Sequence, residues 1–299
     1  MERRDFLKAS LAAAALAAVN PSAPFSAEEK VKVCVTKGST REAIARLLAP
    51  LGGLGSFVKK GSRVLVKANF SFSMPPEAGT STDPDLVKTF ALMCREAGAA
   101  SVIVLDNTIK ASKVCLERTG IEAALKGLDG VKIAVPQKSP DFREVAIPKG
   151  KALTKVKLAN DLFSTDVYIN MPVAKSHGST HVSFGLKNQM GLIQDRTSFH
   201  WKFDIHQGIA DLATVARPQL TILDATRCLK TGGPGGPGTV VQKGLLVAST
   251  DPVALDAYAT TLVEWQDKPT KPQDVKYIVY AAEHGLGVMD LAKMELVEV

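Results

Sequence analysis

Two short apolar runs joined by a helical stretch constrain the fold of this chain most strongly. Residues 63–67 (RVLVK) and 101–105 (SVIVL) are nearly continuous runs of branched apolar residues. Between them, Asp83-Pro84 begins a stretch with helical spacing that ends at Gly98, since Asp is a favoured N-cap and Pro fits the first helical turn. Continuous apolar strands alternating with helices indicate a parallel sheet covered on both faces. We therefore predict an α/β protein with mostly parallel sheets flanked by helices.

The alternation of strands and helices continues along most of the chain. Further strand patterns cover residues 31–36, 166–170, 220–223, 244–248 and 294–297, and helical patterns cover residues 40–48, 199–216 and 275–283 and a segment that Asp251 caps. Residues 131–156 break the rhythm with prolines, so we interpret them as a crossover or a small antiparallel flap. We expect two lobes, an N-terminal α/β lobe with this flap at residues 28–160 and a C-terminal α/β lobe at residues 161–299.

The first 27 residues form an export signal. The pair Arg3-Arg4 precedes the apolar run LAAAALAAV at residues 11–19, which is much shorter than the ~20 residues of a membrane-spanning helix. An amphipathic helix is the alternative, but the run has no polar stripe. We predict a twin-arginine signal peptide over residues 1–27, cleaved after Ala27 or, alternatively, Ala23. The protein is then periplasmic or otherwise extracytoplasmic, with no membrane span after signal removal. Because this route carries folded proteins, a bound cofactor becomes a reasonable expectation.

Composition narrows the classes of partner. The formal net charge is +7, but the lysines are scattered and only 6% of residues are aromatic. A nucleic-acid partner is therefore disfavoured, whereas a small anionic ligand suits the positive charge. The cysteines stand far apart without a CxxC pair, so we expect no iron–sulfur cluster. The four cysteines are Cys34, Cys94, Cys115 and Cys228. They can form disulfides in an oxidising compartment, although the apolar sequence around Cys34 and Cys94 favours buried free thiols at these two positions.

The densest polar cluster follows the strand at residues 166–170. Residues 171–191 (MPVAKSHGSTHVSFGLKNQMG) contain two histidines and two lysines. His177 and His181 are four residues apart, as in a helical metal pair, but the intervening Gly-Ser-Thr favours a loop. Histidine serves as metal ligand, base or anion binder, and lysine as charge partner, covalent attachment point or base. A structural turn is the alternative for the whole cluster.

Other segments are less specific. The loop at residues 231–239 (TGGPGGPGT) is either a flap over a site or a surface loop, and its prolines and the absence of GK[ST] exclude a Walker loop. Asp251 is expected to cap a helix, while Asp256 could point into the lobe interface. No GxSxG or GxGxxG occurs, so serine-hydrolase and ordinary dinucleotide-binding functions have no local support.

Several motifs together resemble a known family. VLVKANF, TSTDPDLV, INMPVAKSHGSTHVSFGLKNQMG, LTILDA with its following Gly-rich loop, and STDPVALDA are similar to the family catalogued as domain of unknown function 362, along nearly the whole mature chain. Members often carry a ferredoxin-like cysteine module, which this sequence lacks, and the resemblance implies no particular reaction. The matching positions are Lys67, Asn69, Thr82, Asp83, Lys175, His177, Thr180, Lys187, Asn188, Gly191, His200, Asp224, Asp251 and Asp256.

A more distant resemblance concerns spacing alone. Nickel-pincer lactate racemases place a histidine ten residues before the lysine that holds their cofactor, and another histidine further on. His177, Lys187 and His200 have a similar layout, although Gly185-Leu186 stands where those enzymes have a Gly-Gly run.

Ligands of doubly wound sheets bind at the carboxyl ends of strands, so these segments are expected to converge there. The leading hypothesis is a metal- or cofactor-assisted enzyme doing acid–base chemistry on a small anionic substrate. The alternative is a periplasmic ligand- or metal-binding protein without turnover. The cofactor is left unidentified, with a metal ion as one candidate. We predict catalytic roles for His177, Lys187 and Lys175, cofactor binding by Lys67, Asn69, Thr180, Asn188 and Asp224, and metal ligation by His177 and His200.

Overall fold

The computed structural model describes residues 30–299, apart from the side chains of residues 197 and 198. Residues Val31–Val299 form one compact unit. The predicted signal peptide and both of its cleavage sites lie outside the described residues. In the part of the chain that the structure describes, no helix combines the length and apolar character needed to cross a membrane.

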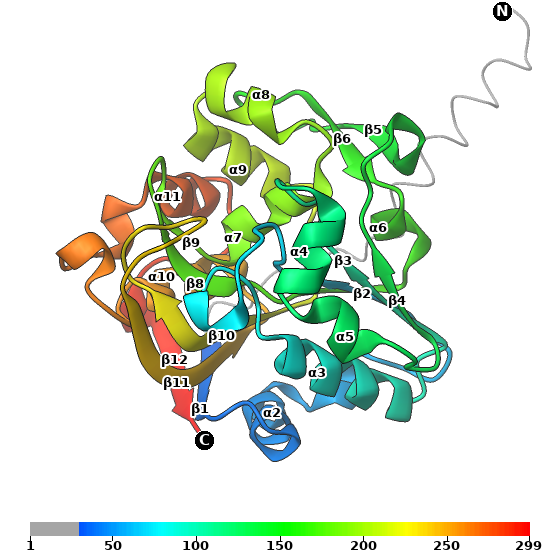
Figure 1. Ribbon diagram of the computed structural model, residues 1–299. Coiled ribbons are helices and arrows are strands. Elements are labelled where there is room, and N and C mark those ends of the chain that lie inside the picture. Colours follow the sequence, from blue (N-terminus) through cyan, green and yellow to red (C-terminus); the bar gives the residue numbers. More distant parts are fainter. Residues whose placement is uncertain (1–29) are drawn as a thin grey trace, which may run out of the picture. The chain divides into compact units, whose positions relative to one another are not determined.

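Strands and helices alternate along the chain (Figure 1). The strands are β1 (Val31–Lys37), β2 (Arg63–Lys67), β3 (Ser101–Leu105), β4 (Val131–Ala134), β5 (Phe142–Ala146), β6 (Lys155–Ala159), β7 (Val167–Asn170), β8 (Val173–His177), β9 (His181–Ser183), β10 (Leu220–Leu229), β11 (Val240–Ser249) and β12 (Met294–Glu298). The α-helices are α2 (Arg41–Leu48), α3 (Pro84–Glu96), α4 (Ser112–Arg118), α5 (Ile121–Leu125), α6 (Asp161–Ser164), α7 (Gly185–Asn188), α8 (Arg196–Trp201), α9 (Ile205–Ala213), α10 (Pro252–Ala259) and α11 (Lys276–Glu283).

A mixed sheet of ten strands organises the described chain. Its main path is β12-β1-β11-β10-β7-β2-β3-β4, and the hairpin β8–β9 joins it where β8 pairs with β10. The run from β10 to β4 is parallel, as are the β10–β8 and β1–β12 pairs, whereas β11 is antiparallel to both of its neighbours. The predicted α/β class, with mostly parallel strands flanked by helices, is confirmed.

The predicted boundary at residues 160–161 does not separate two sheets. Strands β2 and β7 lie on opposite sides of that boundary in the sequence, yet they pair in parallel, with Val66 opposite Ile169. Within the expected flap region, β4 extends the main sheet, while β5 and β6 form a separate antiparallel hairpin.

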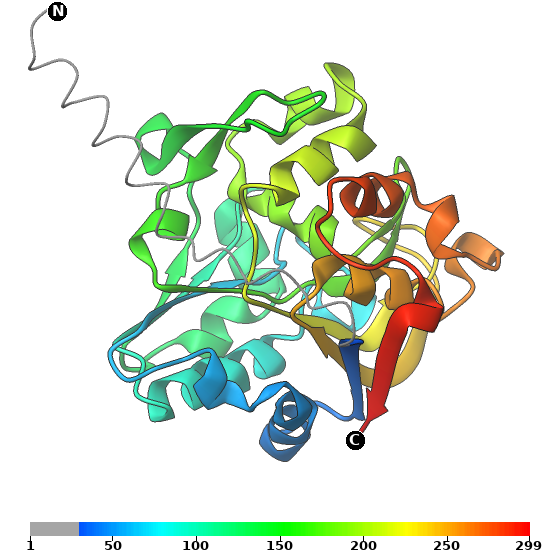
Figure 2. The same ribbon diagram turned by 180° about the vertical axis from the view of Figure 1, so that it is seen from behind.

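Side chains alternate between two cores, one on each face of the sheet. Leu65 and Leu223 belong to the core covered by α7, α9, α10 and α11, whereas Val66 and Ile222 belong to the core covered by α2, α3 and α5. Figures 1 and 2 show these helix groups on opposite sides of the sheet. Since both faces are buried, the central strands need apolar residues at every position, which explains their unbroken apolar runs.

One expectation about local structure needed correction, and one of two alternatives is excluded. The helix expected over residues 199–216 is two helices, α8 and α9, because Asp204 Oδ1 accepts a hydrogen bond from His206 N and caps a new helix there. The cluster after β7 contains a β-hairpin, in which His177 pairs with His181 across the strands β8 and β9. The two histidines therefore do not form a helical metal pair.

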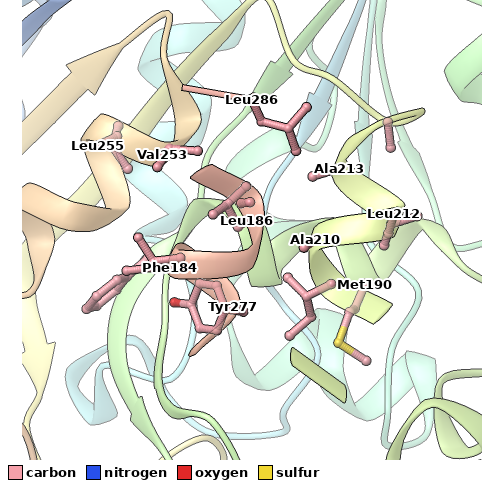
Figure 3. Packing of buried hydrophobic residues seen from close by; sticks show 14 of the residues in the cluster. Phe184, Leu186, Met190, Ala210, Leu212, Ala213, Val253, Leu255, Tyr277 and Leu286 are labelled. Atoms are coloured by element: carbon pink, nitrogen blue, oxygen red, sulfur yellow. The ribbon is translucent and has the colours of Figure 1, made fainter. Parts of the chain in front are cut away.

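The short helix α7 depends on a buried carboxylate. Asp256, on α10, accepts hydrogen bonds from Gly185 N (2.7 Å) and Leu186 N (3.0 Å). A Cβ atom on Gly185 would lie 2.9 Å from Asp256 Oδ1, so glycine permits this close approach. Figure 3 shows Leu186 in the core with Ala210 and Tyr277. A helix of one turn has little stability of its own, so this anchoring fixes its position.

We predict that Asp256→Asn destabilises the protein by about 1–3 kcal/mol, because the amide NH2 cannot accept from a backbone N–H as the carboxylate oxygen does. Urea unfolding of the variant measures the change. Asp290→Asn is the matched control, since Asp290 also caps a helix, through Ala292 N, but on the exposed surface. Equal, small losses in both variants would contradict the anchoring role of Asp256.

Candidate functional site

A cavity of about 360 Å³ lies at the carboxyl ends of β2 and β8. Among its described lining residues, three carry cationic side chains and none carries a carboxylate. The lining consists of Asn69, Ser71, Phe72, Ile109, Lys175, His177, Ser179, Ser183, Lys187, Asn188, Met190, Gly191, Arg196, His200 and Pro234. The expected convergence of strand ends thus produces one cationic cavity.

Lys175 is the most firmly held of the three cations. Lys175 is 2% exposed, and its Nζ donates to Asn69 Oδ1 (2.9 Å) and to the carbonyl oxygen of Thr80 (2.6 Å). The ammonium also lies 4.8 Å from the centre of the Phe72 ring. Burial lowers the pKa of Lys175 to about 7; Asp106 opposes this shift, and the charge of Lys187 adds to it.

Lys187 has the poorest set of partners. It lies on α7 and is 8% exposed, and among the described residues its Nζ donates only to Met190 Sδ, 3.4 Å away. A thioether is a weak acceptor. Burial, aided by the charge of Arg196, lowers the pKa of Lys187 to about 7. Near neutral pH this side chain therefore exists as a mixture of ammonium and free amine.

Arg196 opens α8 and reaches the same cavity. Its Nη1 donates to Ser71 Oγ (3.2 Å), while its buried Nη2 has no hydrogen-bond partner within the described part of the chain. Burial lowers the pKa of the guanidinium, with Asp106 acting in the opposite direction. Guanidinium remains protonated in proteins, so Arg196 supplies a permanent positive charge with a free donor.

His177 is neutral, and its tautomer is defined by the backbone. The amides of Ser179 (3.1 Å) and Thr180 (3.3 Å) both donate to His177 Nδ1, so the ring proton lies on Nε2. Burial, followed by the charges of Lys187 and Lys175, lowers the pKa of His177 to about 2. His177 therefore offers a neutral N–H donor.

His200 lies at the outer side of the cavity. Its ring is nearly parallel to that of His177, with an interplanar angle of 6° and 6.2 Å between ring centroids. Unlike His177, it is exposed. Burial of part of the ring and the charges of Lys187 and Arg196 lower the pKa of His200.

A buried ion pair lies beneath the cavity. Lys67 Nζ, at the end of β2, lies 2.9 Å from Asp106 Oδ1, at the end of β3, and both side chains are fully buried. Burial lowers the pKa of Lys67, and the adjacent Asp106 carboxylate opposes that shift. Asp106 Oδ2 accepts from Phe70 N (2.9 Å) and Ser71 Oγ (2.6 Å). The carboxylate therefore also orients the hydroxyl that accepts from Arg196.

Three asparagines connect this ion pair to the cavity wall. Asn188 Oδ1 accepts from Lys67 Nζ (3.2 Å) and from Asn69 Nδ2 (2.9 Å). Asn188 Nδ2 donates to Asn170 Oδ1 (2.8 Å) and to the carbonyl oxygen of Lys67 (3.1 Å). These bonds orient Asn69 so that its Oδ1 is available to Lys175.

The Gly/Pro loop at residues 231–239 lies against the cavity. Pro234 lines it, and Gly233 N donates to Ser176 Oγ (3.0 Å). A Cβ atom on Gly235 would lie 2.9 Å from Phe72 Cδ1. The small residues of this loop therefore allow close contact with the wall, which favours the flap interpretation over that of a remote surface loop.

Most of the residues selected from the sequence meet at this cavity. Six of them line it: Asn69, Lys175, His177, Lys187, Asn188 and His200. Lys67 lies beneath it, and Thr180 supports His177 through its backbone amide. Asp224 does not line the cavity; its carboxylate accepts from Asp83 N and from Thr226, which fixes the segment before α3.

Sequence reasoning missed Arg196, Ser71 and Phe72 as lining residues. Arg196 was visible only as a basic residue near His200, and no motif distinguishes it. Ser71 and Phe72 follow the selected Asn69 directly. Their position just after a selected strand-end residue is the signal by which they could have been identified.

Comparisons with known proteins agree with the sequence analysis. The chain matches the family described as Domain of unknown function (DUF362) over residues 64–261. Residues 1–19 match the signal sequence of the twin-arginine translocation pathway.

Two individual proteins are also similar. The thylakoid-associated protein sll1697 of Synechocystis sp. is 29% identical over 237 residues, which cover 76% of this chain and 71% of that protein. The structure of the lactate racemase apoprotein from Thermoanaerobacterium thermosaccharolyticum aligns with 10% identity and a TM-score of 0.43, over 77% of this chain and 57% of that chain. This chain therefore spans less than two thirds of the racemase chain.

We predict that Gly191→Ala destabilises the protein by about 3–5 kcal/mol, the range found when a buried ion pair is broken. Its Cβ would lie 2.2 Å from Asp106 Oδ1 and 2.6 Å from Lys67 Nζ. Thermal and urea unfolding measure the loss. Gly55→Ala is the control, because no atom lies within 4 Å of its added Cβ, and it should change stability by no more than about 0.5 kcal/mol. A Gly191→Ala protein as stable as this control would show that the ion pair tolerates displacement.

Proposed function

This chain belongs to the DUF362 family and is exported by the twin-arginine route, and we propose that it is a periplasmic enzyme that binds a small anion in the cationic cavity and transfers a proton to or from it. The observation that carries this proposal is the environment of Lys187. Its Nζ lies in the cavity wall with only a sulfur atom as acceptor among the described residues.

Lys187 is the proposed proton carrier. Its pKa of about 7 lets the amine accept a proton and the ammonium return one near neutral pH. Lys175 has a similar pKa but donates to two oxygen atoms, so its role is to hold the bound anion. Arg196 Nη2 and His177 Nε2–H are further donors for the anion.

The donor set does not fit the metal pair suggested by the sequence. Histidine that binds a metal through one nitrogen almost always donates its other ring N–H, whereas His177 Nδ1 accepts from two amides and leaves the proton on Nε2. Across the residues that the structure describes, no group of three or more histidine, cysteine, aspartate or glutamate side chains could hold a metal ion. The proposal therefore assigns His177 to anion binding and includes no step at a metal.

A binding protein without turnover is the second candidate. It is favoured by the firm hydrogen bonding of Lys175 and Asn69, which suits a preformed receptor for an anion. The two candidates differ in whether Lys187 exchanges a proton with the ligand.

We predict that the mature protein catalyses exchange of a C–H proton adjacent to the carboxylate in one or more simple carboxylates. Incubation with succinate, malate or acetate in D2O, followed by ¹H NMR, measures this exchange. Lys187→Arg keeps the positive charge but cannot release its proton, so exchange should fall by about 10²–10⁴-fold while the melting temperature and anion binding persist. Exchange at the wild-type rate in Lys187→Arg would exclude Lys187 as the proton carrier. Binding of these anions without exchange in the wild-type protein would establish the receptor function instead.

A further inference from the structure

The charges around the cavity do not balance. Lys67 is neutralised by Asp106 beneath the cavity. The three lining cations have only neutral acceptors among the described residues: amide and carbonyl oxygens for Lys175, a thioether for Lys187 and a hydroxyl for Arg196. Buried charge is costly unless it is paired, so a ligand that carries negative charge would relieve this cost.

Arg196 gives an independent indication of a missing partner. Its Nη2 is buried and has no acceptor within the described residues, although Nη1 of the same guanidinium is held by Ser71. A guanidinium presents two parallel N–H donors to a carboxylate or phosphate. The bound hydroxyl holds the guanidinium in place beside the cavity, and its second terminal nitrogen has no acceptor among the described residues.

The number of charges indicates the class of anion. Three basic side chains, Lys175, Lys187 and Arg196, line the cavity, and none of its described lining residues carries a carboxylate. Arg196 remains charged, and a ligand with negative charge favours the protonated form of both lysines. A monoanion would leave part of this charge unpaired.

The cavity is larger than an inorganic anion requires, and part of its wall is apolar. It measures about 360 Å³, within the range of pockets for small organic molecules. Phe72, Ile109, Met190 and Pro234 supply apolar surface beside the cations.

We infer that the cavity takes a compact organic dianion, either a dicarboxylate or a phosphate monoester, whose charged groups meet Lys175, Lys187 and Arg196 and whose carbon body lies against Phe72 and Ile109. This inference rests on the proposed function, because it specifies the class of anion bound at the same site. The two kinds of dianion share the same electrostatic recognition, and they are separated by experiment.

Isothermal titration calorimetry of the mature protein at pH 7 and constant ionic strength tests the inference. The probes are succinate, glycerol phosphate, inorganic phosphate and acetate. We expect a dianion to bind at least tenfold more tightly than acetate, with glycerol phosphate stronger if the natural ligand is a phosphate monoester and succinate stronger if it is a dicarboxylate. Equal binding of acetate and all dianions would overturn the inference.

Two variants separate specific pairing from general attraction. Arg196→Gln should weaken binding of the preferred dianion by about tenfold or more, because it removes the permanent positive charge of the guanidinium from the cavity wall. Lys202→Gln removes an exposed positive charge nearby in the sequence and should leave the affinity within about twofold. Equal losses in both variants would indicate diffuse electrostatic attraction and overturn the inference.

The result is distinguishable from the outcome for the proposed function. Selective dianion binding without proton exchange supports this inference and refutes the proton transfer. Proton exchange on a monocarboxylate, with no preference for dianions, supports the proton transfer and refutes this inference.

Discussion

The carboxylate of Asp106 is the interaction on which the cationic cavity depends. It forms an ion pair with Lys67 and accepts from Ser71 Oγ, which in turn accepts from Arg196. It also opposes the lowering of the pKa of Lys175 by burial. A single buried negative charge therefore supports three basic side chains, those of Lys67, Lys175 and Arg196. Gly191 completes the arrangement, since only a residue without a side chain leaves room for this ion pair.

The unequal surroundings of the two lysines divide their chemistry. Both lie in the same cavity wall and both have a pKa of about 7, but Lys175 is held by two oxygen acceptors and Lys187 by none among the described residues. A side chain without a strong acceptor retains the freedom to take up or release a proton. Asp256 anchors α7 and so holds Lys187 in a buried position, where loss of solvation disfavours the charged ammonium.

The sequence predicted the strands well because strand burial leaves a local pattern. The ranges 63–67 and 101–105 were correct to the residue, and their ends supplied Lys67 and Asp106. The contribution of Arg196 could not be predicted, because its place in the cavity depends on a contact with Ser71, which lies 125 residues away in the sequence. Asp224 was selected by the same strand-end rule, but the strand predicted to end at residue 223 continues to Leu229. Asp224 therefore lies within β10, where its carboxylate accepts from Asp83 N.

The most direct test of the account is ¹⁵N NMR titration of the lysine side chains in the mature protein, with Lys187→Arg and Lys175→Arg used to assign the two buried resonances. We expect both ammonium groups to titrate near pH 7 without a ligand, and we expect saturating dianion to move both midpoints upward because its charge stabilises the protonated forms. Midpoints close to the ordinary lysine pKa of about 10.4, unchanged by any anion, would contradict the existence of a desolvated, uncompensated cationic site.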